Sequence, residues 1–410
     1  MNNIGLEIAF VSNQAIDKII DNVENGRDPM LPEEYINVYT VCYIMCTQRR
    51  PHNYSSELYS RHNDVVTNYL SDTVLLPSMK RDVLDEPDEF MRQVLNQRKK
   101  FEVINTSLKK VFTYLEQYYT KYYSLVCLYV SGLTSYKRIV YDAMKTDVLS
   151  AVLTLVDRYR YGAFDDDDSD LIASSIRYIN AAGTNNPADP FDKSAPCTSF
   201  PCSAASETDY FDEFEPRLLT NTIQHYQSVS LSWNTSCYEV SEYLIQAELA
   251  LHAEAKFAKD FLHEKSAHKL MEAVRQTLLK SHQMESQCRL FLQHDQFDMI
   301  RRAVALFQSL ENGHGLKYLA DVFQGYLAEI GTTLWNDFPD NEKSFVLQLS
   351  RLHVKHLALV SDVFDNKPLF QEAQQQAFTN ILNLNVGRYS GIVFLREFSP
   401  PIKDGMYVEC

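Results

Sequence analysis

The hydrophobic and polar positions of residues 35–48 predict a helix with an unusually wide apolar face. One stripe, at 100° per residue, consists of Tyr35, Val38, Cys42, Met45 and Cys46. A second stripe on its flank consists of Ile36, Tyr39 and Tyr43. With Val41 the arc covers roughly 220°, about twice the width that one core contact needs. Two arrangements remain open: a helix packed on both sides within its own bundle, or a helix whose tyrosine flank faces a partner.

A second wide face occurs between Thr106 and Tyr123. Its apolar positions fill an arc of roughly 180°. They are Leu108, Val111, Phe112, Tyr114, Leu115, Tyr118, Tyr119, Tyr122 and Tyr123. Tyrosine combines apolar area with a polar tip and is enriched at binding hot spots. The pattern is therefore typical of a surface that is alternately solvated and bound.

Helical periodicity continues along the rest of the chain, and the scarcity of glycine and proline favours long helices over a turn-rich β protein. Pro32, followed by two glutamates, suits the first turn of the helix that contains residues 35–48. The exception is residues 181–207, which have four prolines and read as a flexible inserted loop. The predicted helices are 8–23, 32–50, 55–76, 90–103, 106–123, 133–161, 170–182, 210–235, 238–262, 267–292, 296–311, 316–334, 342–364 and 369–384.

Composition and charge narrow the possible partners. The formal net charge is −15, so the chain offers no basic stripe for nucleic acid or an anionic membrane. The sequence has no apolar run long enough to span a bilayer. Its eight cysteines have no CxxC pair and read as reduced thiols. We expect a soluble, intracellular protein located in the cytoplasm and nucleus.

Candidate metal sites fail on spacing. Asp166, Asp168 and Asp170 alternate as in a calcium loop, but Leu171 and Arg177 stand where that loop needs glycine and glutamate. These aspartates are better explained as a solvated turn that caps a helix. The sequence also has no phosphate-binding loop and no nucleophile motif. We predict no catalytic residues and no cofactor.

Two histidine pairs also lack the spacing or the ligands of a metal site. His263 and His268 are five residues apart, whereas a zinc-binding helix needs a spacing of four. His353 and His356 share a helix face, but the sequence supplies no third ligand near them. No metal is expected at either pair.

A collinear set of segments carries a family resemblance. The segments are VYTVCYIMCTQRRPHNYSSELY (38–59), TVLLP (73–77), YLEQYY (114–119), GLTSYKRIVY (132–141), AVLTLVDRYRYG (151–162), CYEVSEYLIQAELALHAE (237–254), FLHEKS (261–266), LSRLHVKH (349–356) and VFDNKPLFQEAQQQAFTNILN (363–383). Over about residues 22–383 the chain resembles the N-terminal, cullin-repeat half of a cullin. It is most similar to the class that binds Skp-type adaptors, and its second helix looks closest to plant members.

The resemblance implies an all-α, elongated α-solenoid of three five-helix cullin repeats. The expected divisions are 1–163 (adaptor-binding repeat), 164–285 (second repeat with the inserted loop 181–207), 286–385 (third repeat) and 386–410 (divergent tail). Cullins of this kind take up the adaptor through the second and fifth helices of the first repeat. By position, the contacts carry over to Tyr35, Ile36, Tyr39 and Tyr43 on one side and to Leu115, Tyr118, Tyr119 and Tyr122 on the other.

The chain departs from the family pattern in several places. Val41 and Met45 replace side chains that are often polar or aromatic in relatives, which puts adaptor choice in doubt. Ala303 falls where the third repeat usually has a larger residue. The sequence after residue 383 lacks the globular half to which the resemblance assigns RING-box binding, so no RING-box binding is expected.

We therefore expect a non-enzymatic scaffold, the stalk of a cullin-RING (SCF-type) ubiquitin ligase that binds a Skp-type adaptor and F-box protein. A truncated cullin that competes for the adaptor is one form of this hypothesis. The alternative is a helical rod of a vesicle-tethering complex, which would make no special use of Tyr39 and Tyr119. An enzyme is the least favoured interpretation.

Overall fold

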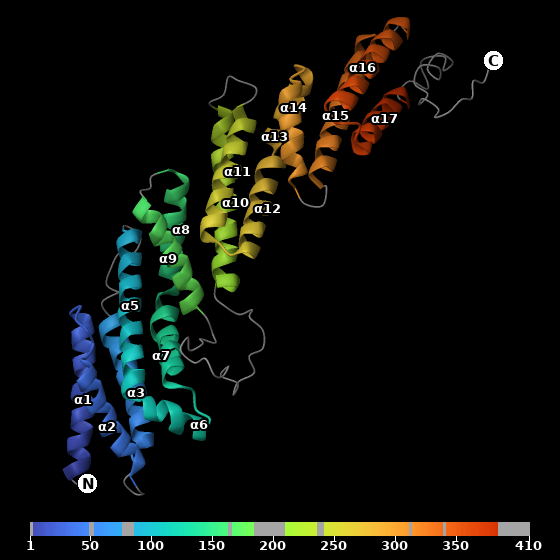
Figure 1. Ribbon diagram of the computed structural model, residues 1–410. Helices are drawn as coiled ribbons and strands as arrows, with labels where there is room; N and C mark the ends of the chain where they lie inside the picture. The colour runs from blue at the N-terminus through green and yellow to red at the C-terminus, as the bar shows by residue number, and fades with distance from the viewer. Residues whose placement is uncertain are drawn as a thin grey trace. The chain divides into compact units, whose positions relative to one another are not determined.

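The computed structural model describes residues 3–48, 53–75, 86–162, 166–183, 210–235, 242–310, 314–338 and 342–383, and every regular element among them is helical (Figure 1). The chain divides into two compact units. The first comprises Met1–Asn221 with Asp260–Leu262, and the second comprises Thr222–Lys259 with His263–Cys410. The predicted all-α fold class is confirmed. The boundaries predicted for the three repeats stay a prediction.

Long helices, several of them continued by a π-helical turn, build the first unit. Their bounds are α1 Asn3–Glu24, α2 Pro32–Thr47, α3 Ser55–Tyr69 with η1 Leu70–Leu75, α5 Pro87–Val111, η2 Leu115–Tyr119, α6 Thr120–Tyr122, α7 Leu128–Tyr136, η3 Lys137–Tyr141, α8 Asp142–Arg160, α9 Asp166–Ala182, η4 Tyr210–Phe214 and α10 Glu215–Thr235. The division between the units falls within α10, after Asn221. The predicted loop begins later than expected, since α9 continues to Ala182, and residues 184–209 lie outside the described part.

The connection between α1 and α2 follows the sequence signals closely. Gly26 has φ +69°, and the N–H of Arg27 donates to the Asn22 carbonyl at 2.8 Å, which closes α1 with a glycine C-cap. The second helix begins at Pro32 as predicted. Glu34 accepts a hydrogen bond from the Leu31 N–H at 3.1 Å and satisfies one of the free donors at the helix start.

The helices predicted at 90–103 and 106–123 are one continuous helix up to Val111, so the predicted break near residue 105 is wrong. The reason is tertiary. Asn105, which lies between the two predicted helices, is 1% exposed and donates a hydrogen bond to the Tyr129 carbonyl at 3.0 Å, so this polar residue is held inside the unit. The helix is interrupted at Phe112, where the Thr113 hydroxyl donates back to the Lys110 carbonyl at 2.7 Å.

The second unit consists of the larger part of α10, from Thr222 onward, and of seven further helices that lie wholly or mainly within it. Their bounds are α11 Glu242–Phe261, α12 Glu264–Leu279, α13 His282–Gln293, α14 Phe297–Gln308, α15 His314–Asp337, α16 Glu342–Asp362 and α17 Pro368–Asn383. The single helix predicted over 267–292 is wrong, because Ser281 starts a new helix. Its hydroxyl accepts a hydrogen bond from the Met284 N–H at 3.1 Å, as an N-cap does. Residues 384–410, including the predicted tail, lie outside the described part.

Three aromatic side chains, from α15, α17 and the turn before α17, pack together in the second unit. Phe323, Phe364 and Phe370 are all buried, and the rings of Phe364 and Phe370 stack with centroids 3.9 Å apart. Ala303 is 1% exposed and lines a small internal cavity of about 10 Å³ beside Phe323. The small residue at this position, where relatives usually have a larger one, is consistent with the cavity.

Gly132 is required where α7 crosses α5. A Cβ atom there would lie 2.2 Å from the Asn105 Oδ1 atom, and Asn105 is itself held by its bond to Tyr129. We expect Gly132→Ala to lower the free energy of unfolding by about 1–3 kcal/mol, as overpacking does, measured by chemical denaturation. The control is Gly325→Ala in α15, whose Cβ would meet only the flexible end of Arg289 at 3.1 Å. Equal behaviour of the two variants would contradict this packing.

Candidate functional site

Helix α2 buries one of its two apolar stripes and exposes the other. Val38, Cys42, Met45 and Cys46 are buried against the first unit. On the flank, Ile36 is 64% exposed and Tyr43 is 44% exposed. Tyr35 and Tyr39 are half-buried. The arrangement with one stripe in the bundle and the flank accessible is therefore the one that this helix adopts.

The segment after Phe112 also presents tyrosines to solvent. Tyr118 is 59% exposed and Tyr122 is 80% exposed, whereas Tyr119 is half-buried. Leu115 is 0% exposed and belongs to the core of the free chain, so its exposure gives no support to the predicted adaptor contact, which stays a prediction. The periodicity placed Leu115 on the wide apolar face but could not show that neighbouring helices cover this part of it.

Ring contacts join the two segments. The rings of Tyr43 and Tyr114 meet edge to face with centroids 5.3 Å apart. From there the contacts extend to Tyr39, stacked on Tyr43 at 6.2 Å, and to Tyr118, at 4.9 Å from Tyr114. Tyr114 was not among the predicted contact residues. Its spacing of four residues from Tyr118 was the available signal, since such pairs share a helix face.

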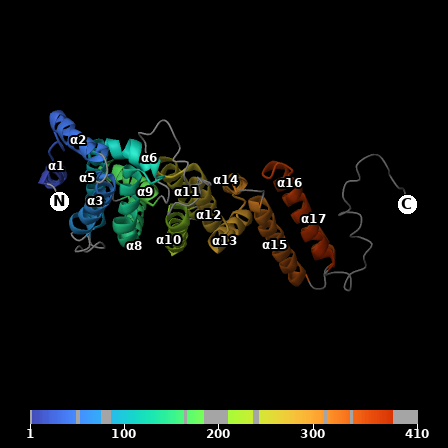
Figure 2. The same cartoon turned by 90° about the horizontal axis from the view of Figure 1, so that it is seen from below.

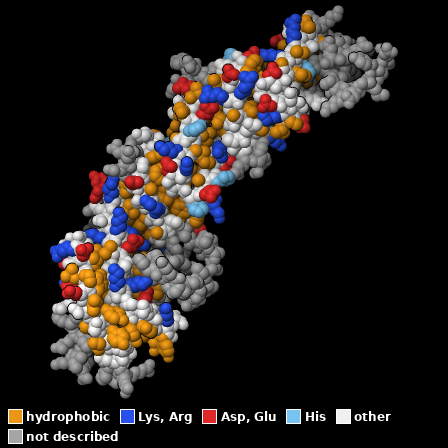
Figure 3. All heavy atoms as spheres, in the orientation of Figure 1, with side chains coloured by type: hydrophobic (Ala, Val, Ile, Leu, Met, Phe, Trp, Pro, Cys, Tyr) orange, Lys and Arg blue, Asp and Glu red, His pale blue; other side chains and the backbone are white. Residues whose placement is uncertain are grey.

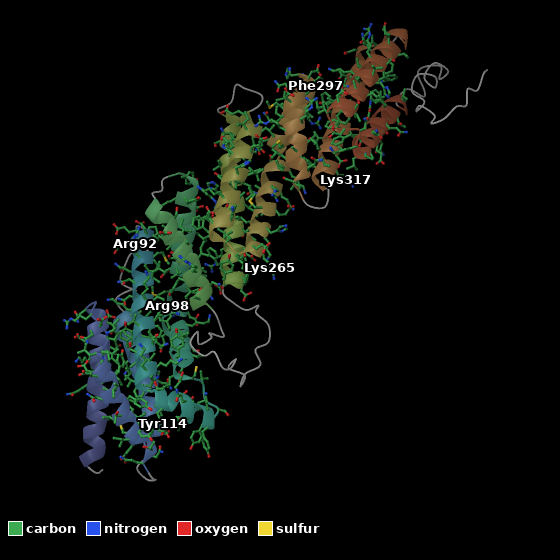
Figure 4. The ribbon with its side chains drawn as sticks, viewed as in Figure 1. Arg92, Arg98, Tyr114, Lys265, Phe297 and Lys317 are labelled. Atoms are coloured by element: carbon green, nitrogen blue, oxygen red, sulfur yellow. The ribbon has the colours of Figure 1, made fainter. Side chains whose placement is uncertain are left out.

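A second group of rings extends the same surface. Tyr119 lies 5.9 Å from Tyr59 and 4.9 Å from Tyr123, and Tyr122 lies 4.8 Å from Tyr123, between ring centroids. Figure 2 shows α2 and α6 on the same side of the first unit, and Figure 4 labels Tyr114 near the lower end of that unit. Hydrophobic side chains gather over this end (Figure 3). We define the tyrosine surface as Ile36, Tyr39, Tyr43, Tyr114, Tyr118, Tyr119, Tyr122 and Tyr123.

A groove adjoins the tyrosine surface at the start of α2. It has a volume of about 600 Å³ and lies between the 28–32 segment and α5. Tyr35 lines it, and the Lys110 ammonium nitrogen lies 5.6 Å from the centre of the Tyr35 ring. Of the predicted contact residues, Tyr35 thus belongs to the groove rather than to the chain of ring contacts.

Two phenols and two thiols near this surface are held in their neutral forms. Burial raises the pKa of the Tyr59 and Tyr114 phenols above their usual range. Burial also raises the pKa of the Cys42 thiol to about 12, and that of Cys46. A buried protonated thiol is a poor nucleophile. The site offers apolar area and hydroxyl groups, which suits protein binding rather than catalysis.

The other sequence candidates have structural roles. His356 is 2% exposed, and its Nδ1 atom lies 2.8 Å from the Leu352 carbonyl oxygen; burial lowers its pKa. The His263 side chain accepts a hydrogen bond from the Lys265 N–H at 3.3 Å and caps α12. The side chains of Asp166 and Asp168 lie outside the described set. Within that set, no three metal-ligating side chains come together.

Across the helices that the structure describes, none has the length and apolar character needed to cross a membrane.

Comparison with known families decides the identity. The cullin family, through its cullin α-solenoid domain, matches residues 11–394 of the 410. The chain belongs to the cullin family. Cullins are non-catalytic scaffolds of ubiquitin ligases, and family members bind adaptors or substrate receptors. The resemblance seen in the sequence is confirmed.

Individual relatives come from several cullin classes. Cullin-1 of Oryza sativa subsp. japonica is 28% identical over 409 residues, which cover 94% of this chain and 51% of that protein. Putative cullin-like protein 2 of Arabidopsis thaliana is 25% identical and is matched over 90% of its length. Cullin-3 of Dictyostelium discoideum is 24% identical over 380 residues. The chain spans about half the length of the first of these cullins and most of the second.

Proposed function

We propose that this cullin chain is the adaptor-binding part of a cullin-RING ubiquitin ligase of the SCF type, with a Skp-type adaptor and its F-box protein as partners. The tyrosine surface is the observation that carries the proposal. Its residues come from two segments distant in the sequence, and five of its eight members are exposed although they are aromatic or aliphatic. The similarity to rice Cullin-1 over 94% of this chain supports the choice of adaptor class.

The composition of the tyrosine surface fits a protein interface. Interface cores are enriched in tyrosine and depleted of charged side chains, and a few central aromatic residues contribute most of the binding energy. Ile36, Tyr118 and Tyr122 are more than half exposed and would be desolvated by a partner. Tyr114 links the two helices beneath them, so the exposed rings are already positioned before binding.

The free thiols of the chain agree with a reducing compartment. Cys42, Cys46 and Cys288 are buried and free. We propose the cytoplasm and nucleus as its location. Membership of the cullin family argues against the vesicle-tethering alternative.

Competition with a complete cullin tests the proposal. The 410-residue polypeptide should form a complex with an adaptor–F-box pair on size exclusion, and added in excess it should inhibit substrate ubiquitination by a reconstituted complete ligase. Inhibition is expected because the polypeptide and the complete cullin would compete for the same adaptor. Adding further adaptor–F-box complex should restore ubiquitination.

Two results would contradict this function. One is an unchanged ubiquitination rate when the polypeptide exceeds the complete cullin many-fold. The other is inhibition that additional adaptor cannot relieve, because the polypeptide would then act on another component. The proposal that the polypeptide is itself a competitor also predicts no ubiquitin transfer when it replaces the complete cullin.

A further inference from the structure

The groove beside the tyrosine surface has the dimensions and lining of a peptide-binding site. Its volume is about 600 Å³. We call it the lysine groove and define it by Leu31, Tyr35, Lys99, Val103, Thr106 and Lys110. Leu31 is 64% exposed and Val103 is 43% exposed, so two aliphatic side chains line it without being covered.

The α5 side of the lysine groove is one continuous stripe. Lys99, Val103, Thr106 and Lys110 follow the spacing of a single helix face. The two lysines are about 16 Å apart along the helix axis. An extended peptide of about five residues spans that length, whereas a single small anion would reach only one lysine.

The charges of the groove favour an acidic occupant. Lys99 and Lys110 have no carboxylate partner among the described residues; Lys110 meets only the Tyr35 ring. Glu102 is already engaged, because the Arg98 Nε donates to its carboxylate at 2.9 Å. Asp28 is the one groove-lining carboxylate left without a described partner. In a chain of net charge −15, this groove therefore presents two free positive charges against one negative charge.

We propose that the lysine groove binds an acidic, extended segment of the same adaptor that covers the tyrosine surface. Its carboxylates would pair with Lys99 and Lys110, and an apolar side chain between them would pack on Leu31 and Val103. This inference rests on the proposed function. Continuity supports it: Tyr35 lines the groove one helical turn before Tyr39, and Lys110 precedes Tyr114 by one turn on the facing helix.

Charge-reversal variants test the groove proposal. Their affinity for the Skp-type adaptor is measured by isothermal titration calorimetry. Lys99→Glu and Lys110→Glu should each weaken binding by about fivefold, and the double variant by more. Asp28→Asn should strengthen binding, because it removes the opposing charge. The control is Lys256→Glu, an exposed lysine of α11 in the second unit, which should leave the affinity unchanged. The double variant should also lose part of the salt dependence.

A second measurement reports occupancy directly. Thr106→Cys carrying a fluorescent label places a probe between the two lysines, and its emission should shift when adaptor is added. A label on Lys256→Cys should not respond. Occupancy is thereby detected even if the charge effects are small.

The outcomes separate this inference from the proposed function. If Tyr118→Ala abolishes adaptor binding while the lysine variants and the Thr106 label show no effect, the groove assignment is overturned and the adaptor function stands. If the wild-type chain shows no affinity for the adaptor, the proposed function fails and the groove proposal with it. If the adaptor binds, but Tyr118→Ala and the lysine variants bind it as the wild type does and the Thr106 label does not respond, both surface assignments are overturned. Loss of affinity in both lysine variants, with a responding Thr106 label, supports both the groove assignment and the proposed function.

Discussion

Tyr118→Ala should weaken adaptor binding by about 30- to 1,000-fold without changing the thermal stability of the chain. A central hot spot contributes about 2–4 kcal/mol, which converts to that range of affinity. Tyr118 is 59% exposed in the free chain, so its truncation removes interface area rather than core packing. Ile36→Ala should act in the same direction on α2, because Ile36 is 64% exposed.

We expect Tyr39 and Tyr119 near the centre of the interface, where truncation affects both adaptor affinity and the stability of the fold. Both are half-buried and in ring contact, Tyr39 with Tyr43 and Tyr119 with Tyr59. Their alanine variants should therefore lose adaptor affinity by a similar factor and also lower the melting temperature. Measuring affinity and melting temperature on each variant separates the two effects.

An exposed tyrosine elsewhere provides the matched control. Tyr161 is 71% exposed and lies at the end of α8, outside the tyrosine surface. Tyr161→Ala should bind the adaptor as the wild type does. Wild-type affinity in folded Tyr118→Ala and Ile36→Ala would show that the tyrosine surface is not the adaptor site.

Helix positions were largely predictable because local signals determine them. Pro32 and Gly26 mark the start of α2 and the end of α1 in the sequence as in the structure. The errors arose where tertiary contacts decide the outcome. Asn105 continues a helix, and its buried amide donates a hydrogen bond to a neighbouring carbonyl. Ser281 starts a helix although the apolar periodicity continues across it.

The site was also predictable only where local periodicity determines which side chains share a helix face. Periodicity identified Ile36, Tyr43, Tyr118 and Tyr122 on wide apolar faces, and the structure exposes them. It could not show that Leu115 on such a face is covered. The lysine groove was not predicted, because its two walls come from residues 28–35 and 99–110 and no single stretch of sequence contains its pattern.

His62 gives the first unit a stability that depends on pH. Its side chain is 1% exposed, its Nε2 atom has no hydrogen-bond partner among the described residues, and its ring packs edge to face on Phe112 at 5.7 Å. Burial lowers the pKa of His62 to about 4, from an ordinary value of 6.5. The neutral ring is therefore the form that the fold accommodates.

The direction of the effect follows from where the proton binds. Between pH 6.5 and pH 4 the unfolded chain takes up a proton at His62 and the folded chain does not, so stability falls as the pH falls through this window. The loss should total about 3 kcal/mol. It is absent above pH 7, where both states are neutral at this residue.

His62→Gln should remove this dependence, because glutamine does not titrate. Hydrogen exchange of α3 and α5 amides, followed by mass spectrometry, measures the pH dependence of stability. The free energy of protection of the wild type relative to the variant should decrease by about 2.5 kcal/mol between pH 7.5 and pH 4.5. Comparing both proteins at each pH cancels the intrinsic exchange rate. His252→Gln, at an exposed histidine of α11, is the control and should track the wild type. A wild-type–variant difference in protection that does not change with pH would mean that protonation of His62 costs the folded state nothing, and that the ring is accessible to water.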